Sequence, residues 1–369
     1  MKNSILYQLA VTSMGLDLGD KFSYFFVLAP DGEILREGRV RTTPEELEQL
    51  LKSLKPARVA LEVGTHSPWV SRLVSKCGHE VLVANPRDLR LIYENKNKSD
   101  QLDAEQLARI ARLDPTLLHP IQHRKAETQL ALASLRARDA LVKARTKLVN
   151  HVRGAVKSTG KRLPVCSAAS FHNKVGESLP EDLRAVLEPL LKLSGELTDQ
   201  IRKYDKSLEA LSEQKYPATT RLRYVTGVGP LTALAFVLVL ENPSRFGNSR
   251  AVGAYLGLTP QKSQSGGHDP QMRITKAGDG FLRRLLVGSA QYILGPFGPD
   301  SDLRRYGKAL AQRGGKNGKK RAVVAVARKL AVLLHVLWLS HDPYDPLRNA
   351  KRKSRRAASE VGTQAAELN

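Results

Sequence analysis

Two carboxylates stand three residues apart at the start of a segment with helical periodicity. Asp100 and Asp103 precede apolar residues at helical spacing, and Ser99 is a favourable N-cap, so a helix beginning there carries both acids on one face. Two anions this close repel each other unless a cation or a proton lies between them. Mg²⁺ suits that role because it binds carboxylates together with phosphate oxygens of a substrate. The plain alternative is an acidic first turn that complements the helix dipole.

Two further acids lie in predicted strands. Asp17 falls inside the first apolar run of the chain, a costly place for a lone charge, and Glu62 stands near the end of a buried run that begins at Arg58. If these two strands are neighbours, both acids can face the helix of the first pair. Four gathered acids in a basic chain would hold two metal ions roughly 3.5–4 Å apart, which activate the attacking oxygen and stabilise the leaving oxygen in phosphodiester chemistry.

The elements that must position these acids belong to an α/β layer. Apolar runs on either side of the turn Asp31-Gly32 predict a three-stranded antiparallel meander. Thr43-Pro44-Glu45-Glu46 is a capping box with proline at the first helical position. The order β-β-β-α-β-α-β-α indicates a mixed sheet covered by helices. The predicted strands are 14–18, 24–28, 33–41, 58–63 and 80–84, and the predicted helices are 43–54, 69–76 and the one that begins at Ser99.

Two long helices are predicted in the middle of the chain. Lys125–Val156 is rich in Ala, Leu, Lys and Arg, and a second helix after Ser194 has apolar residues at heptad spacing from Leu197 to Leu211. A coiled-coil arm and an intramolecular helical hairpin fit this pattern equally well. No structure is predicted for residues 160–180. Further on, residues 251–256 and 319–341 are predicted to be helical.

The turn around Gly227 and Gly229 opens an apolar helix, 231–240. A tight Gly-x-Gly turn at a helix start offers backbone N–H groups to a phosphate without reading sequence. The alternative is a packing loop between two helices. Four cations farther along are also placed in the sequence to bind a phosphate. They are Arg273, Lys276, Arg283 and Arg284.

A polar, glycine-rich loop precedes and includes the first of these cations. It contains Ser263, Ser265 and His268. Loops of this composition are often only flexible, and His268 is interpreted as an exposed histidine rather than a general base. His66 and His79 lie at predicted element boundaries, where exposed polar residues are common, and are not interpreted as metal ligands.

The net charge of the chain indicates which kind of molecule it binds. The 369 residues, enough for two or three domains, carry 59 Lys and Arg against 36 Asp and Glu, a net charge of +23 spread along the chain. Such a field favours polyanions, with nucleic acid first and an anionic membrane surface second. The run KRKSRR lies in a tail, 346–369, that is predicted to be disordered and basic.

Other observations indicate a soluble cytoplasmic protein. The apolar run Ala322–Leu339 is interrupted by Arg328 and Lys329, which argues against a membrane span, and the N-terminus has no signal-peptide pattern. Only Cys77 and Cys166 are present, so a disulfide framework and a cysteine zinc site are not expected.

The motifs GLDLGDK, LEVGTHSPW, VANPRDL and NKSDQLDAEQLA occur in one order along the chain. In this the chain resembles the DEDD transposases of bacterial insertion sequences, the insertion sequence 110 family, from Gly15 to about Leu339. The resemblance implies a RuvC-like N-terminal domain with the ribonuclease H fold, in which Mg²⁺ or Mn²⁺ is bound. EVGTHS stands where many members have a Glu-Ala-Thr-Gly sequence, which leaves the glutamate assignment intact. The implied metal-binding tetrad is Asp17, Glu62, Asp100 and Asp103.

The family also has a serine followed by glycine after Gly-Leu-Thr-Pro. Ser265 occupies that place and is the implied nucleophile, with Ser263 as the competitor two residues away. The resemblance implies a RuvC-like domain at 1–115, a helical coiled-coil arm for dimerisation at 116–218 and a mainly α transposase domain at 219–345. The protein would act as a dimer or tetramer in the bacterial cytoplasm, associated with the nucleoid.

The implied reaction is excision and insertion of the mobile element that encodes the protein. A structured guide RNA from the element's non-coding end would pair with donor and target DNA and select both sites. Two other classes stay open. A nuclease of the Holliday-junction resolvase type needs the four acids but no serine, and a non-catalytic nucleic-acid packaging protein needs only the charge.

Overall fold

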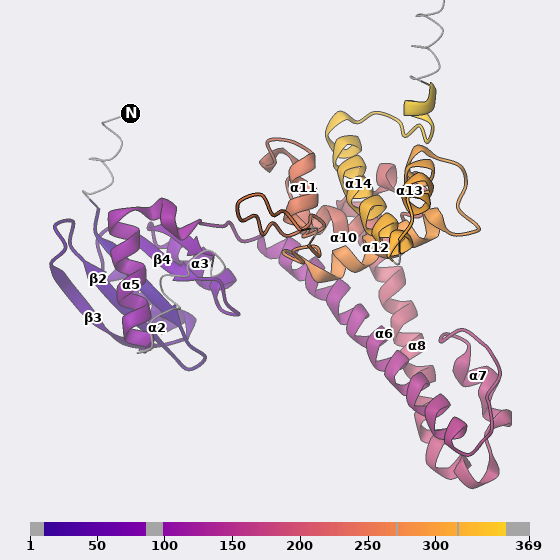
Figure 1. Cartoon of the computed structure of the whole chain (residues 1–369). Helices are drawn as coiled ribbons and strands as arrows, with labels where there is room; N and C mark the ends of the chain where they lie inside the picture. Colours follow the sequence, from indigo (N-terminus) through magenta and orange to yellow (C-terminus); the bar gives the residue numbers. More distant parts are fainter. Residues whose placement is uncertain (1–10, 86–98, 271, 316, 352–369) are drawn as a thin grey trace, which may run out of the picture. The chain divides into compact units, whose positions relative to one another are not determined.

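The computed structural model of the chain describes residues 11–85, 99–270, 272–315 and 317–351 (Figure 1). The backbone divides into two compact units, one that ends at Lys125 and one that begins at Ala126. The first unit is a mixed α/β layer and the second is built from helices, so the α/β-plus-α class expected from the sequence is what the structure has.

The first unit contains a five-stranded sheet with the strand order β3-β2-β1-β4-β5. The first three strands pair antiparallel, whereas β4 pairs parallel to both β1 and β5. The predicted meander and the predicted neighbours β1 and β4 are therefore confirmed. The strands are β1 (Ser13–Leu18), β2 (Phe22–Leu28), β3 (Ile34–Arg41), β4 (Arg58–Glu62) and β5 (Glu80–Ala84).

Helices cover both faces of this sheet. On one face α2 (Pro44–Lys52) and α3 (Ser67–Lys76) pack on an apolar core that includes Met14 and Leu16. On the other face lies α5 (Asp100–Leu113), followed by the short helix η1 (Pro115–Leu118) (Figure 1). Successive side chains of a strand point to opposite faces, so every second residue of β1 faces α5.

The backbones of β1 and α5 meet at Gly15. A Cβ at this position would lie 1.9 Å from the carbonyl oxygen of Ala104 and 2.6 Å from the nitrogen of Ala108. Both atoms belong to the backbone of a helix, so no side-chain rotation can make room for a methyl group. The position of α5 on the sheet therefore depends on a glycine in β1.

We expect Gly15→Ala to destabilise the first unit by about 3 kcal/mol or more. Overpacking of a close-packed core costs about 1–3 kcal/mol, and here the obstruction is backbone rather than a flexible side chain. Urea unfolding measures the change, with Gly64→Ala as the matched control because a Cβ at Gly64 meets no atom within 4 Å. An unfolding midpoint for Gly15→Ala equal to that of the wild type would contradict this packing.

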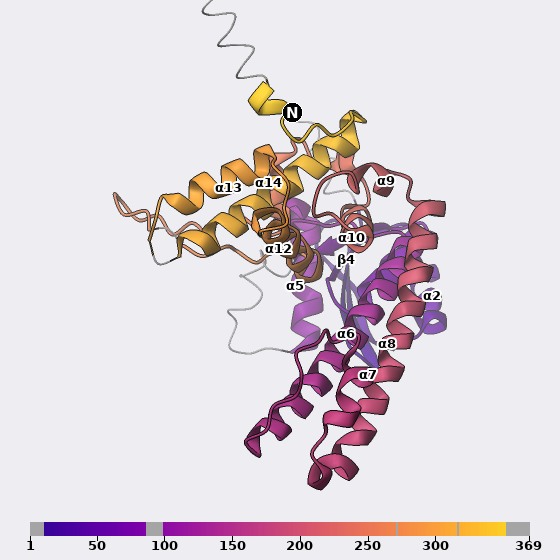
Figure 2. The ribbon, with the colours of Figure 1, turned by 90° about the vertical axis from the view of Figure 1, so that its right-hand side faces the viewer.

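The second unit begins with a helical hairpin. Helices α6 (Ala126–Ser158) and α8 (Glu181–Lys215) lie side by side (Figures 1 and 2). Arg138 of α6 pairs with Asp205 of α8 at 2.8 Å, and Ile201 and Leu208 of the predicted heptad are buried. The structure thus has the intramolecular hairpin. Between the helices, the unplaced segment forms α7 (Phe171–Val175) and η2 (Gly176–Ser178), in a small core of its own.

The second long helix begins earlier than expected from the sequence. It starts at Glu181 rather than after Ser194 and continues through Pro189. Proline lacks a backbone N–H and normally interrupts a helix, which is why the pattern before Ser194 did not indicate one.

The remaining helices pack around the apolar helix α10, whose residues from Thr232 to Leu240 are all buried. Among the described residues, only helix α14 (Gly318–Ser340) is long and apolar enough to span a membrane by length and composition. The charges of Arg328 and Lys329 therefore do not exclude a membrane span by this test. Within the unit, 44% of its most apolar stretch is buried. The helices are α9 (Ala218–Leu222), α10 (Pro230–Leu240), η3 (Pro243–Arg245), α11 (Arg250–Tyr255), α12 (Gly280–Leu294), α13 (Asp302–Gln312) and α14 (Gly318–Ser340).

The first residues of the predicted disordered tail are held on α13. Asp302, at the start of that helix, accepts hydrogen bonds from the N–H groups of Asn349 (2.7 Å) and Ala350 (3.3 Å). Its own N–H donates to the carbonyl of Pro346 at 2.7 Å. Disorder from residue 346 onward is therefore wrong for 346–351, and residues 352–369 lie outside the described part of the chain.

Candidate active site

Asp17 and Glu62 reach the same edge and the same face of the sheet. Strands β1 and β4 run parallel, with Gly15 opposite Ala60 and Leu16 opposite Leu61, so the two acids come next in register. Gly15 lies against α5, and Ala60 belongs to the core formed with α5. The acids stand two residues farther along their strands and therefore share the α5 face.

The direction of α5 brings its first turn to that edge. Arg58, at the start of β4, donates a hydrogen bond to the carbonyl of Ala111 (3.2 Å), near the end of the helix. The helix therefore runs antiparallel to β4, and its first turn lies toward the end of β4 that carries Glu62. Ser99 caps this turn as predicted, since its hydroxyl accepts from the N–H of Leu102 at 3.3 Å.

Asp100 and Asp103 both belong to the sheet-facing stripe of α5. Asp100 is four residues before Ala104 and Asp103 is four residues before Leu107, and both of these apolar residues are buried. Asp103 is half-buried, like Asp17 and Glu62, whereas Asp100 is exposed. Three separate segments thus deliver the four predicted acids to one face at one edge of the sheet.

The four acids have the chemistry that a divalent metal needs. Four carboxylates offer oxygen ligands only, which is the preference of Mg²⁺ and Mn²⁺. In residues 11–85 and 99–351, apart from 271 and 316, no three Asp, Glu, His or Cys side chains stand close enough to hold one ion. The residues fit such an ion by their chemistry and by the face they share.

His66 lies in the loop just after Glu62 and was not among the predicted site residues. Its Nδ1 accepts a hydrogen bond from the indole N–H of Trp69 (3.1 Å), and its Nε2 is 3.8 Å from a carboxylate oxygen of Asp20. Since Nδ1 accepts, the proton of the neutral ring is on Nε2. In the sequence, the spacing His-x-x-Trp at the start of a helix could have indicated this contact between the two rings.

His79 has a structural role and is not exposed, contrary to the expectation for a residue at an element boundary. It is only 7% exposed. Its Nδ1 accepts from the N–H of Ala57 (3.1 Å), so its Nε2 donates to the carbonyl of Leu51 (3.0 Å).

The loop with the predicted serine is an irregular hairpin in the second unit, held by two isolated backbone bridges rather than by strands. Pro260 pairs with Ile274 near its base, and Ser265 pairs with His268 at its tip through two backbone hydrogen bonds of 3.2 and 3.1 Å. Gly266 has a φ of +56° in the turn. Ser265 is exposed, and its hydroxyl makes no hydrogen bond within the described residues. The hairpin therefore presents a serine hydroxyl at its tip.

The base of this hairpin is fixed by close backbone contacts. A Cβ at Gly257 would lie 2.3 Å from the nitrogen of Ala277, and both Gly257 and Gly278 have positive φ angles. Arg283 donates to the carbonyls of Leu256 (2.9 Å) and Ala277 (2.7 Å) and so joins the two sides.

Arg283 and Arg284 are predicted phosphate ligands, but in the structure both make polar contacts within the second unit. Arg284 of α12 forms an ion pair of 2.5 Å with Asp139 of α6. Burial raises the pKa of Asp139, but hydrogen bonds from Lys143 and Arg284 outweigh it and hold that pKa below its usual value. Arg273 and Lys276, by contrast, are exposed and form no ion pair within the described residues.

The two predicted glycines differ in their surroundings. Gly227 has a φ of +84°, and a Cβ there would lie 3.0 Å from the carbonyl oxygen of Ser289, so the packing alternative holds for it. Gly229 is the N-cap residue of α10, and a Cβ there would have no atom within 4 Å. Of the two, Gly229 is the position open to a ligand.

Comparison with known proteins adds an independent finding. Residues 14–160 match a family model described as a transposase, and residues 219–302 match one described as the transposase IS116/IS110/IS902 family. The chain is 30% identical over 290 residues to the transposase for insertion sequence element IS1328 of Yersinia enterocolitica, covering 77% of this chain and 84% of that protein.

Two more relatives are similar over most of the chain. The transposase for insertion sequence element IS1111A of Coxiella burnetii is 27% identical over 340 residues, 90% of either chain. A pilin gene-inverting protein of Moraxella lacunata is 25% identical over 272 residues, 72% of this chain and 75% of that protein.

Proposed function

Because this chain belongs to the IS116/IS110/IS902 family of transposases and is therefore a DNA transposase, we propose that it excises and inserts its own element by cutting and rejoining DNA at the acids of its first unit. The observation that supports this proposal is that Asp17 and Glu62 follow paired residues of β1 and β4 on the face covered by α5, the helix whose first turn carries Asp100 and Asp103. The strand order β3-β2-β1-β4-β5 is compatible with a RuvC-like, ribonuclease H-like unit.

The four acids would hold Mg²⁺ or Mn²⁺. When bound, the metal supplies Lewis-acid stabilisation of charge on the phosphate oxygens. The protein's own contribution is to place carboxylates from β1, β4 and α5 at one edge, with the first turn of α5 stabilising anions through its exposed N–H groups. A nuclease of the resolvase type would use the same acids.

The serine distinguishes the transposase from that nuclease. In the proposed step, the Ser265 oxygen forms a bond to phosphorus while the bond from phosphorus to the sugar oxygen breaks. The serine proton is lost to a base, and the released sugar oxygen takes up a proton. The phosphoserine diester retains the energy of the broken bond, so rejoining needs no ATP. The position of Ser265 at an exposed hairpin tip supports this role.

We propose that an element-encoded RNA selects the DNA sites in a dimer or tetramer acting in the cytoplasm. The sequence contains no zinc finger or homeodomain, and a charge of +23 spread along the chain suits contacts to phosphates. Base pairing with a guide would then supply the sequence specificity.

RNA-free protein should retain salt-sensitive DNA binding but lose site-specific recombination. The measurement uses nuclease-treated protein on donor and target plasmids, with the co-purifying RNA added back in a parallel reaction. Restoration by that RNA and not by an unrelated RNA of equal length is the expected result. Recombination of one defined site by RNA-free protein would show that the guide is unnecessary.

A further inference from the structure

A large groove lies on the second unit and brings together cations from several of its segments. It has a volume of about 1610 Å³ and is enclosed by the base of the hairpin, α13, α14 and the segment from Pro343 to Asn349. Among the described residues that line it, nine are lysine or arginine and two are aspartate. We propose that this groove binds a single polynucleotide strand, with bases on its apolar floor and phosphates on its cationic rim.

One stripe of α14 lines the groove, and its basic part belongs to the rim whereas its apolar part belongs to the floor. The stripe residues recur at intervals of three and four, as one face of a helix requires. The basic residues of the stripe lie in its N-terminal part, with Val324 and Ala325 between them, and the C-terminal part is apolar. In that order the stripe includes Arg321, Arg328, Lys329, Val332, Leu333 and Val336.

Several cations of the rim have no carboxylate partner among the described residues, whereas Arg348 lies 3.5 Å from a carboxylate oxygen of Asp342. Within the described residues, Arg250 and Arg273 on one side and Arg313, Lys320 and Arg328 on the other form no ion pair with a carboxylate. Elsewhere in the unit, Arg138 and Arg284 do form such pairs. Unpaired cations that converge on one groove repel one another, and a polyanion relieves that repulsion while it releases its own counterions.

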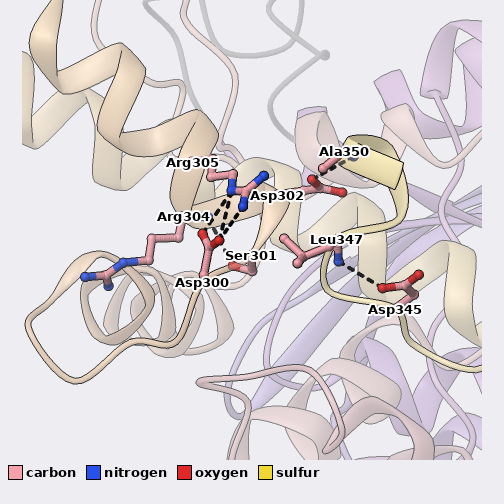
Figure 3. A network of polar contacts seen from close by, with 8 residues as sticks. All are labelled: Asp300, Ser301, Asp302, Arg304, Arg305, Asp345, Leu347 and Ala350. Carbon is pink, nitrogen blue, oxygen red and sulfur yellow. Dashed lines mark hydrogen bonds and ion pairs between the residues drawn. The ribbon is translucent and has the colours of Figure 1, made fainter. Parts of the chain in front are cut away.

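The two carboxylates are bound to the groove's own wall (Figure 3). Asp302 accepts from the N–H groups of Asn349 and Ala350. Asp345 accepts from the N–H of Leu347 (3.0 Å), which with Lys351 holds the pKa of Asp345 below its usual value. Both acids accept backbone hydrogen bonds from the segment that lines the groove, and neither forms an ion pair with a cation of the rim among the described residues.

Aromatic and apolar side chains favour a single strand over a duplex. Tyr306 is 37% exposed with the Lys329 ammonium 4.0 Å from its ring centre, and Met272 is 39% exposed. Such surface gains from contact with unpaired bases, which a duplex keeps inside. The chain's own KRKSRR segment has the same charge as the rim and is a poor occupant.

The test measures binding of fluorescent oligo(dT) and oligo(U) in EDTA, where no cleavage occurs. Lys320→Glu with Arg328→Glu should weaken binding at least tenfold and lower the slope of log affinity against log salt by about 1.4, at roughly 0.7 for each lost phosphate contact. Arg273→Glu on the opposite wall should act in the same direction. The matched control is Lys203→Glu with Lys206→Glu, which makes the same charge change at exposed residues of α8 outside the groove and should change affinity less than twofold.

Further probes distinguish binding of the bases from binding of the phosphate charge alone. An abasic strand of equal length should bind about tenfold more weakly, because each stacked base contributes roughly 1–3 kcal/mol. Equal binding of the abasic strand, tighter binding of a duplex, or wild-type affinity of the groove variants would overturn the inference. The DNA and RNA arms identify which strand is preferred.

The inference rests on the proposed function only in that a transposase handles polynucleotides. Binding in EDTA does not require the acids, so Asp17→Asn should bind the strand normally. Loss of cleavage in Asp17→Asn and loss of binding in the groove variants are therefore separate outcomes, and either proposal can fail alone.

Discussion

Asp17→Asn should reduce DNA strand cleavage by on the order of 10²–10³-fold or more, the loss typical of removing one group that stabilises transition-state charge. Asparagine has nearly the same size as aspartate, so β1 keeps its place beside β4 while one of the four acids is lost. DNA binding should persist, because the change removes a negative charge from a chain of net charge +23. Asp103→Asn should behave in the same way.

The measurement is nicking of a supercoiled donor plasmid in Mg²⁺, with binding followed separately by fluorescence anisotropy. Glu37→Gln is the matched control, since it neutralises an exposed acid on β3, away from the proposed site. Its cleavage rate should equal that of the wild type. Unchanged cleavage by Asp17→Asn, or full cleavage by the wild type in EDTA, would rule out the proposed acid site.

Ser265→Ala should abolish recombination and the covalent protein–DNA adduct. Alanine has no oxygen to bond to phosphorus, and loss of a catalytic nucleophile lowers turnover by on the order of 10³-fold or far more. The backbone pairing of Ser265 with His268 does not involve the side chain, so the hairpin should remain folded.

Trapping on a nicked substrate, followed by denaturation and peptide mapping, places the adduct on the chain. Ser263→Ala is the matched control because it removes an exposed hydroxyl two residues away from the tip pairing. An adduct mapped to Ser263, or normal recombination by Ser265→Ala, would transfer the role to another residue and leave the acid site untouched.

The sequence predicted the elements that carry the acids because local chemistry determines them. The apolar runs of β1 and β4 and the N-cap at Ser99 each act within a few residues, and all three are found as expected. Helix α13 was not predicted. Gly307 in its middle disfavours a helix, yet a Cβ there would lie 2.5 Å from Leu294 and 2.6 Å from Val326, so tertiary packing requires the glycine.

The sequence could not show which cations have partners within the protein and which are left for a ligand. The sequence indicated the same phosphate-binding role for Arg273 and Arg283, but Arg283 joins the base of the hairpin and Arg273 lines the groove. The groove itself combines cations from distant segments, such as Arg250, Arg313 and Lys320. Only tertiary structure distinguishes a charge that has an internal partner from one that awaits an external partner.

The contact between the backbones at Gly15 also limits how this chain can diverge from its relatives. No side chain separates β1 from α5 there, so at this point the distance between the strand and the helix is set by their backbones. Among members of the family that keep this close packing of helix on strand, we therefore expect the position of Gly15 to accept no residue other than glycine.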